Sequence, residues 1–245
     1  MFKEQRTDKV LEIIRERKYV NVETLVSLLH YSPATIRRDI TYLANLGLVR
    51  KSYGGVSIIN SKPVIVREHD SIAEKVEICK KASELINDGD YVFIDGTTTT
   101  YFLGETLLNK KNVTVVTTNL KLAMFLGEHK INCYVCSGQV WDSEFLCGEF
   151  VSDLIDKMNF DCAFFSVGAV SEDGRFSINE KFLSFMKTAK SRSKKSVLLC
   201  DSNKIGLEVK KYFGKLNFFD IVICDEQISE SITKNFTETQ FIVSK

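Results

Sequence analysis

The chain has 245 residues, 44% of them hydrophobic and 27% charged, an ordinary composition for a globular protein long enough for two domains. No apolar run approaches the roughly 20 residues that cross a bilayer. The first residues also lack the apolar core of a signal peptide, so we expect a cytoplasmic protein without membrane contact.

Charge is distributed unevenly along the chain. Residues 1–60 carry ten lysines and arginines against six acidic residues, whereas the rest of the chain carries 23 against 26. A basic head on a mildly acidic body is typical of a protein in which only one part binds DNA.

Helical periodicity dominates the basic head. Apolar residues predict one helix around 10–17 and a short second helix over 22–29. Ser32 and Pro33 then favour a third helix over 33–46, because a serine hydroxyl caps free amides and proline fits the first helical position. A short helix, a turn and a capped helix form a helix-turn-helix, whose last helix enters the major groove.

The stretch 48–59 turns at Gly54-Gly55 and reads as a β-hairpin, which would form a wing beside the third helix. Arginines can contact guanine edges or phosphates, and small residues allow close approach to the groove. The residues expected to contact DNA are Ser32, Ala34, Thr35, Arg37, Arg38 and Thr41 on the helix and Arg50, Lys51 and Tyr53 on the wing. For the helix taken alone, a solvated helix with two incidental arginines is the alternative.

The run Thr35-Ile-Arg-Arg-Asp39, with Gly54-Gly55 after it, closely resembles the signature of the deoxyribose-operon repressor (DeoR) family. This resemblance implies a bacterial transcription regulator, with repression as the family expectation. Tyr31 departs from the small aliphatic residue usual before the capping serine, a change that affects packing of the turn.

A polar stretch with Pro63 follows the wing and is predicted to be a linker over 61–71, between a DNA-binding domain (1–60) and a second domain (72–245). Beyond it, a helix over 71–87 precedes apolar runs that alternate with helical stretches, which predicts an α/β domain with a largely parallel sheet. The expected strands are 91–94, 113–116, 131–136, 162–167, 197–200, 219–224 and 241–243, and the expected helices are 98–109, 119–129, 146–158, 179–192 and 227–235.

Ligands of such sheets bind outside the carboxyl ends of the strands, so the strand-end loops form the candidate binding site. The run Asp95-Gly96-Thr97-Thr98-Thr99 can cradle a phosphate with free amides, a helix dipole and hydroxyls, although threonines that only cap a helix are the alternative. The other candidates at strand ends are Thr118, Asn119, Gly138, Gly168, Asp201 and Lys204.

The order of these loops is similar to that in the sensor domain of the same family, which is related in fold to ribose-5-phosphate isomerase. The resemblance implies a phosphorylated sugar as effector. Two positions depart from the family pattern: Thr97 replaces a glycine, and Leu183 replaces a basic residue. Glu180, Lys181 and Lys187 are candidates to assist near Leu183. Paired half-sites on operator DNA require at least a homodimer, and no cofactor is expected.

An enzyme is the main alternative, because the isomerase-like fold hosts catalysis. Related isomerases carry two acids at an Asp-Gly-Ala-Asp turn, whereas the matching positions here are Val167 and Val170. The expected base for proton transfer is therefore missing, and Glu149, Asp161 and Glu180 are the acids that would have to replace it. A purely structural interaction module is a further alternative.

Seven cysteines are scattered through the body, mostly in apolar runs. Cys133 and Cys136 have the spacing of a metal or redox pair, but on a strand they would point to opposite faces of the sheet. We therefore expect reduced core cysteines and no metal site.

Overall fold

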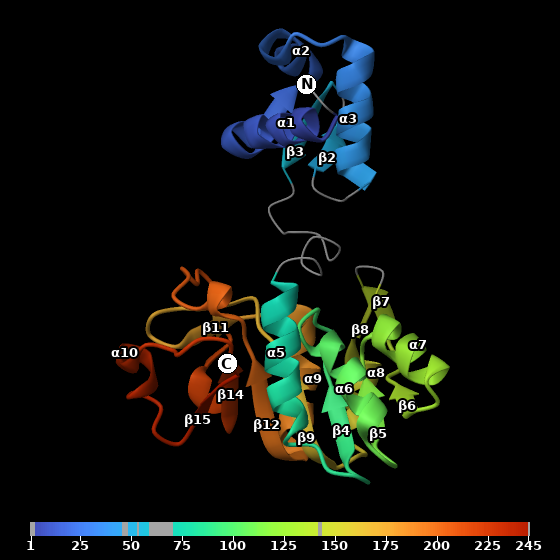
Figure 1. The fold of residues 1–245 in the computed structure, drawn as a ribbon, viewed down its shortest axis with the longest axis vertical. Helices are drawn as coiled ribbons and strands as arrows, with labels where there is room; N and C mark the ends of the chain where they lie inside the picture. Colours follow the sequence, from blue (N-terminus) through green and yellow to red (C-terminus); the bar gives the residue numbers. More distant parts are fainter. Residues whose placement is uncertain (1–2, 46–48, 53, 59–70, 142–143, 245) are drawn as a thin grey trace. The chain divides into compact units, whose positions relative to one another are not determined.

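The computed structural model describes residues 3–45, 49–52, 54–58, 71–141 and 144–244. The chain divides into two compact units, Met1–Asp70 and Ser71–Lys245, called here the head and the body (Figure 1). Of the linker expected over 61–71, only Ser71 lies within the described residues.

Among its described residues, the head contains three helices and a small antiparallel sheet, as expected for a winged helix-turn-helix. Its elements are α1 (Lys3–Arg17), β1 (Tyr19–Asn21), α2 (Val22–Leu29), α3 (Pro33–Asn45), β2 (Val49–Ser52) and β3 (Gly55–Ile58). The wing has one strand more than the expected hairpin, because β1 pairs with β3 and places Val20 opposite Val56. Asn21 caps α2, because its Oδ1 accepts a hydrogen bond from Thr24 N at 2.7 Å.

One hydrophobic core holds the head together. The expected apolar positions of α1 and α3 contribute to it, including Ile14 and Ile36, which are fully buried. Val49 of β2 and Val56 of β3 close the same core, so the wing is packed onto the helices. This packing fixes the polar face of α3 relative to the wing strands.

The body is built on a parallel sheet whose described strands have the order β15-β14-β12-β9-β4-β5-β6. These strands are β4 (Tyr91–Ile94), β5 (Thr114–Thr117), β6 (Asn132–Val135), β9 (Phe160–Phe165), β12 (Ser193–Leu199), β14 (Ile221–Cys224) and β15 (Gln240–Val243). The strand order reverses between β4 and β9, which is the position where sheets of this kind leave a crevice for ligands.

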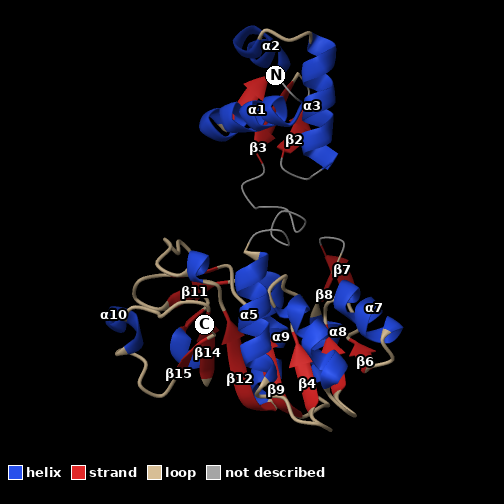
Figure 2. Ribbon diagram, in the orientation of Figure 1, coloured by secondary structure: helices blue, strands red, loops and turns tan. Residues whose placement is uncertain are grey.

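Helices cover both faces of this sheet (Figures 1 and 2). Alternate residues of the central strands point to opposite cores: Ile94 packs with α5 and Phe93 with α9. Among the described helices, α5 (Ile72–Ser83), α6 (Leu103–Thr106) and α7 (Leu120–Glu128) pack on one face, and α8 (Glu149–Ile155) and α9 (Glu180–Ser191) pack on the other. Near the C-terminus lies α10 (Glu230–Thr233). None of the helices in the described part of the chain is long and apolar enough to cross a membrane.

Two expected helices are wrong in part. The stretch 98–109 is divided into η1 (Thr100–Phe102), α6 and η2 (Leu107–Asn109), with tight turns at both ends. The stretch 146–158 begins instead as β8 (Phe145–Cys147), which pairs with β7 (Gln139–Trp141), and the chain turns at Gly148, whose φ is 109°. Only glycine adopts that conformation readily.

A second small sheet lay outside the sequence expectations. It joins β10 (Ala169–Val170), β11 (Arg175–Ser177) and β13 (Gly214–Lys215), and η3 (Ser202–Lys204) and η4 (Leu216–Phe218) are single 3₁₀ turns nearby in sequence. The sheet's strands are two or three residues long, too short to show a periodicity of their own.

Candidate functional site

Ser32 and Thr35 build the start of α3. The Ser32 hydroxyl oxygen accepts a hydrogen bond from Thr35 N at 3.2 Å, and the two hydroxyl oxygens lie 2.9 Å apart. The expected serine cap is therefore present. Both hydroxyls take part in it, which positions the first turn of α3 before any DNA is bound.

The aspartate of the Thr-Ile-Arg-Arg-Asp motif faces inward. Asp39 is 1% exposed and pairs with Arg6 of α1 through two contacts, Nε to Oδ2 at 2.6 Å and Nη2 to Oδ1 at 3.0 Å. This hydrogen bonding raises the pKa of the Arg6 guanidinium. Arg6 also lies over the Tyr31 ring at 5.1 Å, so the unusual tyrosine packs into the turn as expected. Sequence reasoning missed Arg6, because nothing local marks a partner 33 residues away.

The two arginines of the same motif, together with Ala34, are exposed on α3. Thr41, one turn beyond Arg37, donates to the Arg37 carbonyl at 2.7 Å and accepts a hydrogen bond from Lys51 Nζ of the wing at 2.8 Å. A groove of about 650 Å³ between α2, α3 and the wing is lined in part by Arg37, Thr41 and Lys51. Arg50 is exposed on β2, and Tyr53 lies outside the described residues.

In the body, Asp95 holds two strand-end loops together. Its carboxylate is 3% exposed; Oδ2 accepts a hydrogen bond from Ser166 N at 2.9 Å, across the boundary between β4 and β9. Oδ1 accepts hydrogen bonds from Thr97 N, Thr97 Oγ1 and Thr100 Oγ1 at 3.0, 2.7 and 2.6 Å. Burial raises the pKa of this carboxyl, and these hydrogen bonds oppose the rise. Asp95 thus supports the loop through contacts within the protein.

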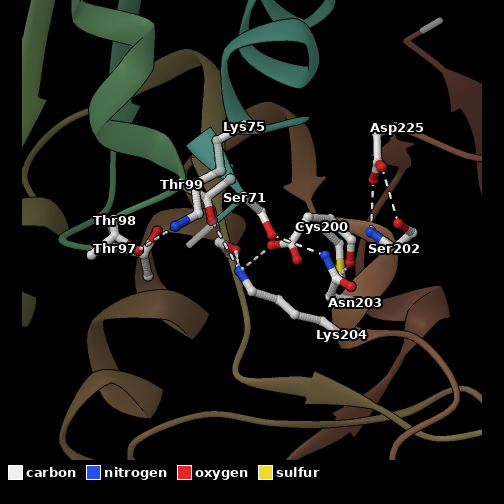
Figure 3. Close-up of polar contacts among 12 residues, drawn as sticks. Ser71, Lys75, Thr97, Thr98, Thr99, Cys200, Ser202, Asn203, Lys204 and Asp225 are labelled. Atoms are coloured by element: carbon white, nitrogen blue, oxygen red, sulfur yellow. Dashed lines mark hydrogen bonds and ion pairs between the residues drawn. The ribbon is translucent and has the colours of Figure 1, made fainter. Parts of the chain in front are cut away.

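The four consecutive threonines divide into two pairs. Thr97 and Thr100 direct their hydroxyls to Asp95 and to each other. Thr98 and Thr99 face two lysines instead: Thr98 Oγ1 accepts from Lys75 Nζ at 3.5 Å, and Thr99 Oγ1 accepts from Lys204 Nζ at 2.9 Å (Figure 3). The hydroxyl that Thr97 adds to the family pattern is therefore used inside the loop.

Lys204 joins three strand ends. Its ammonium contacts Thr99 after β4, Ser166 Oγ after β9 at 3.2 Å, and Asp201 Oδ2 after β12 at 3.0 Å. Asp201 is 3% exposed, and although its Oδ2 lies close to Lys204, that oxygen accepts no well-directed hydrogen bond from the described residues. A buried carboxylate oxygen without a donor can accept a hydrogen bond from a ligand hydroxyl.

The residues around Lys204 are fixed by the next strand. Ser202 donates to Asp225 through its amide at 2.7 Å and through its hydroxyl at 3.0 Å, and Asp225 is 1% exposed (Figure 3). Asp225 was not among the expected residues. It positions the turn that carries Lys204.

Gly96 and Thr118 adjoin the same loop from the β5 side. A Cβ atom on Gly96 would lie 3.0 Å from the Phe145 ring and 3.1 Å from Thr118 Oγ1, so a glycine lets the loop pack closely there. Thr118 Oγ1 is buried with no hydrogen-bond partner among the described residues. Asn119 caps α7 by accepting from Leu122 N at 3.0 Å, and its Nδ2 lies 3.5 Å from Gly96 O.

The remaining expected effector residues have other surroundings. A Cβ on Gly138 would lie 2.7 Å from Cys147 O, so this glycine permits close packing on β8. Gly168 donates its amide to Ser177 O at 2.8 Å. Glu180 is exposed at the start of α9 and pairs with Lys211.

Sequence reasoning also missed Lys75. It is 2% exposed on α5, although lysines are almost never fully buried unless they are paired. The signal was present in the sequence: Lys75 occupies the core-facing position between Ile72 and Cys79, three residues after one and four before the other.

The acids considered as substitutes for a catalytic base do not join this cluster. Asp161 lies at the amino end of β9, where it accepts from Tyr91 N at 2.9 Å and pairs with Lys194 at 2.7 Å. These contacts lower the pKa of Asp161. Glu149 is exposed in the first turn of α8.

The cysteines of the described residues are all free, and most are buried. Cys136 belongs to the core under α8 and α9, whereas Cys133 packs against the core on the opposite face of the sheet. The expected opposite orientation of the two thiols is confirmed. In the described part of the chain, no three histidine, cysteine or acidic side chains are grouped to hold a metal ion.

Comparison with known proteins matches both units. The model of the DeoR-like helix-turn-helix domain matches residues 6–62, and the model of the DeoR C-terminal sensor domain matches residues 70–226. The chain is 30% identical to a lactose phosphotransferase system repressor of Streptococcus mutans over 99% of its own length and 100% of the relative's. It is 27% identical to a glycerol-3-phosphate regulon repressor of Escherichia coli, over 96% and 95% of the two lengths.

Among solved structures, a ribose 5-phosphate isomerase from Methanocaldococcus jannaschii matches 54% of this chain and 53% of its own, with 19% identity and a TM-score of 0.40. The two family matches together span most of the chain and confirm the resemblance drawn from the motifs. The chain therefore belongs to the DeoR family of transcriptional regulators, with a helix-turn-helix domain followed by a sensor domain.

Proposed function

We propose that this protein is a sequence-specific repressor of a carbohydrate-use operon, and that a phosphorylated sugar bound at the strand-end loops controls its affinity for operator DNA. The observation that carries the DNA-binding part is the exposed face of α3. Arg37 and Arg38 project from it, and the Lys51–Thr41 contact fastens the basic wing to the same helix. Both full-length relatives described above are repressors, which supports repression as the direction of control.

The strand-end loops support the effector part of the proposal. Lys204, Asp201 and the threonine loop meet at the carboxyl ends of β4, β9 and β12. An ammonium and hydroxyls suit a phosphate, and a buried carboxylate suits sugar hydroxyls. Val167 and Val170, which stand where related isomerases have acids, favour binding without catalysis. Two copies of the chain would present two heads to paired half-sites, in the cytoplasm where operator DNA is found.

The test is a pull-down of fragmented genomic DNA at physiological salt, followed by sequencing. We expect enrichment of a few sites, and loss of that enrichment with Arg38→Ala. The matched control is Lys80→Ala, which removes the same charge from an exposed position of the body. A mixture of hexose and pentose phosphates should change the yield of the enriched fragments. Absence of enrichment with and without the mixture would contradict the proposal.

A further inference from the structure

We propose that Lys75 is a second cationic ligand of the effector's phosphate, and that it acts together with Lys204 on the two hydroxyls of Thr98 and Thr99. This inference rests on the proposed function and names the groups that hold the charged end of the effector. The family signature on the strand-end loops does not include Lys75, because this residue lies on α5, the first helix of the body.

The first support is the position of the ammonium groups. Lys75 Nζ reaches Thr98 Oγ1 from α5, and Lys204 Nζ reaches Thr99 Oγ1 from η3, so two lysines approach neighbouring residues of one loop from different elements (Figure 3). Cys79, one turn after Lys75, donates its thiol to Thr99 O at 3.2 Å. This contact packs α5 directly against the loop that both ammonium groups reach.

The second support is the burial of Lys75. The side chain is 2% exposed, and its ammonium is directed at the loop and not along α5 into solvent. A buried ammonium interacts more strongly with a neighbouring anion than an exposed one does, because little water screens the interaction. A phosphate on Thr98 and Thr99 would supply charged oxygens to Lys75 and Lys204 together.

The third support is that no long helix begins at the threonine loop, so a helix dipole contributes little attraction for a phosphate there. The sequence predicted a long helix from residue 98, whose dipole would attract an anion, but the helical segment that follows the threonines is η1 and then the four-residue α6. A dipole effect is confined to well-formed helix termini, so a phosphate at this loop depends on side-chain cations. Asp201 already neutralises part of the Lys204 charge, so a second cation beside the threonines would strengthen phosphate binding at this loop.

Inorganic phosphate is the probe for this inference. The melting temperature of the full chain is followed as phosphate is raised, against sodium chloride at equal ionic strength. We expect stabilisation specific to phosphate, with an apparent affinity at least about tenfold weaker in Lys75→Met and in Lys204→Met, since each loses a charge-assisted hydrogen bond. Lys81→Met is the matched control, because Lys81 lies on the same helix but is partly exposed and pairs with Glu84.

Three results would overturn the inference: phosphate affinity of Lys75→Met within about twofold of the wild type, an equal loss in Lys81→Met, or no phosphate-specific stabilisation of the wild type. If Lys75→Met does not fold, Thr98→Val is measured in its place, because it removes the hydroxyl at nearly constant volume. We expect Thr98→Val to bind phosphate more weakly than the wild type. Unchanged phosphate binding would contradict the inference. The genomic pull-down with wild-type protein does not depend on Lys75. The inference about Lys75 can therefore fail while the proposed function stands.

Discussion

Asn203 donates a hydrogen bond from Nδ2 to the hydroxyl of Ser71 at 2.9 Å, across 132 residues of sequence. Asn203 directly precedes Lys204, and Ser71 directly precedes α5, which carries Lys75. Ser71 is also the first residue of the body, and its backbone is left-handed, with φ 54°. One contact therefore joins the candidate effector loops to the point where the chain arrives from the head (Figure 3).

This contact leads to a prediction about coupling. An effector changes DNA affinity only if it favours one arrangement of the protein over another, and the Asn203–Ser71 bond is a contact whose strength can differ between arrangements. We expect Asn203→Ala to bind phosphate with nearly wild-type affinity while the sugar-phosphate effect on DNA affinity falls about fivefold, the value of roughly one hydrogen bond. Phosphate melting curves and operator titrations measure the two quantities separately. An unchanged effector response would remove Asn203 from the coupling.

The second prediction concerns the stability of the head. Arg6→Ala leaves Asp39 buried without its cation, which should cost about 3 kcal/mol of the head's free energy of unfolding. Arg6→Lys should restore only part of it, because an ammonium cannot reproduce the two-point contact of the guanidinium. Amide hydrogen exchange in α1 and α3 reports this local free energy.

Arg15→Ala is the control for that measurement, since Arg15 is exposed on the same helix, and it should change the free energy by less than about 0.5 kcal/mol. The result would count against the assignment if Arg6→Ala exchanged as slowly as the control. That outcome would mean that the Arg6–Asp39 pair does not stabilise the packing of α1 on α3.

The third prediction concerns salt. DNA affinity should fall steeply as salt rises, because lysines and arginines on phosphates release counterions. Arg50 lies exposed on the wing strand β2, where a phosphate contact is expected. Arg50→Ala should weaken binding to all sequences similarly and reduce the slope of log affinity against log salt by about 1 per head. A change of sequence preference with an unaltered slope would assign Arg50 to a base edge instead.

The sequence predicted the helices and strands that have a regular hydrophobic periodicity, and the residues that belong to a recognisable motif. The third helix followed from its Ser32–Pro33 start, because a serine cap and a proline suit the first turn. The parallel sheet followed from apolar runs that alternate with helical stretches. The contacts that depend on tertiary structure did not follow. Arg6 meets Asp39 only once α1 packs on α3, and Lys75 reaches Thr98 only because α5 packs on the threonine loop.

Asp95 is a residue for which the sequence predicted a ligand contact but the structure shows contacts within the protein. Its place at a strand end before a threonine turn predicted a ligand, yet the carboxylate is occupied by Ser166, Thr97 and Thr100. Strand-end position alone does not distinguish an acid that supports a loop from one that binds a ligand, because both lie where neighbouring loops converge. The buried Oδ2 of Asp201 pairs with Lys204 but accepts no well-directed hydrogen bond from the described residues, so it suits a ligand hydroxyl better.

The last prediction concerns the cysteines and pH. Burial raises the pKa of Cys136 to about 12 and that of Cys133 and Cys162 to about 11. The folded protein therefore keeps these protons over a range in which unfolded thiols, with a pKa near 8.5, lose them. The contribution to stability is complete below that unfolded value and disappears as pH rises through about 11 to 12.

At pH 8.5, iodoacetamide should thus alkylate the native cysteines slowly and the urea-unfolded ones quickly, as followed by mass spectrometry of the peptides. Cys133 should react first in the native protein, since it is only partly buried, and Cys136 should lag behind it. Because the two thiols face opposite cores, added zinc should protect neither. Joint protection of Cys133 and Cys136 by zinc would instead require both thiols on one side of β6, which a regular strand does not allow for residues three positions apart.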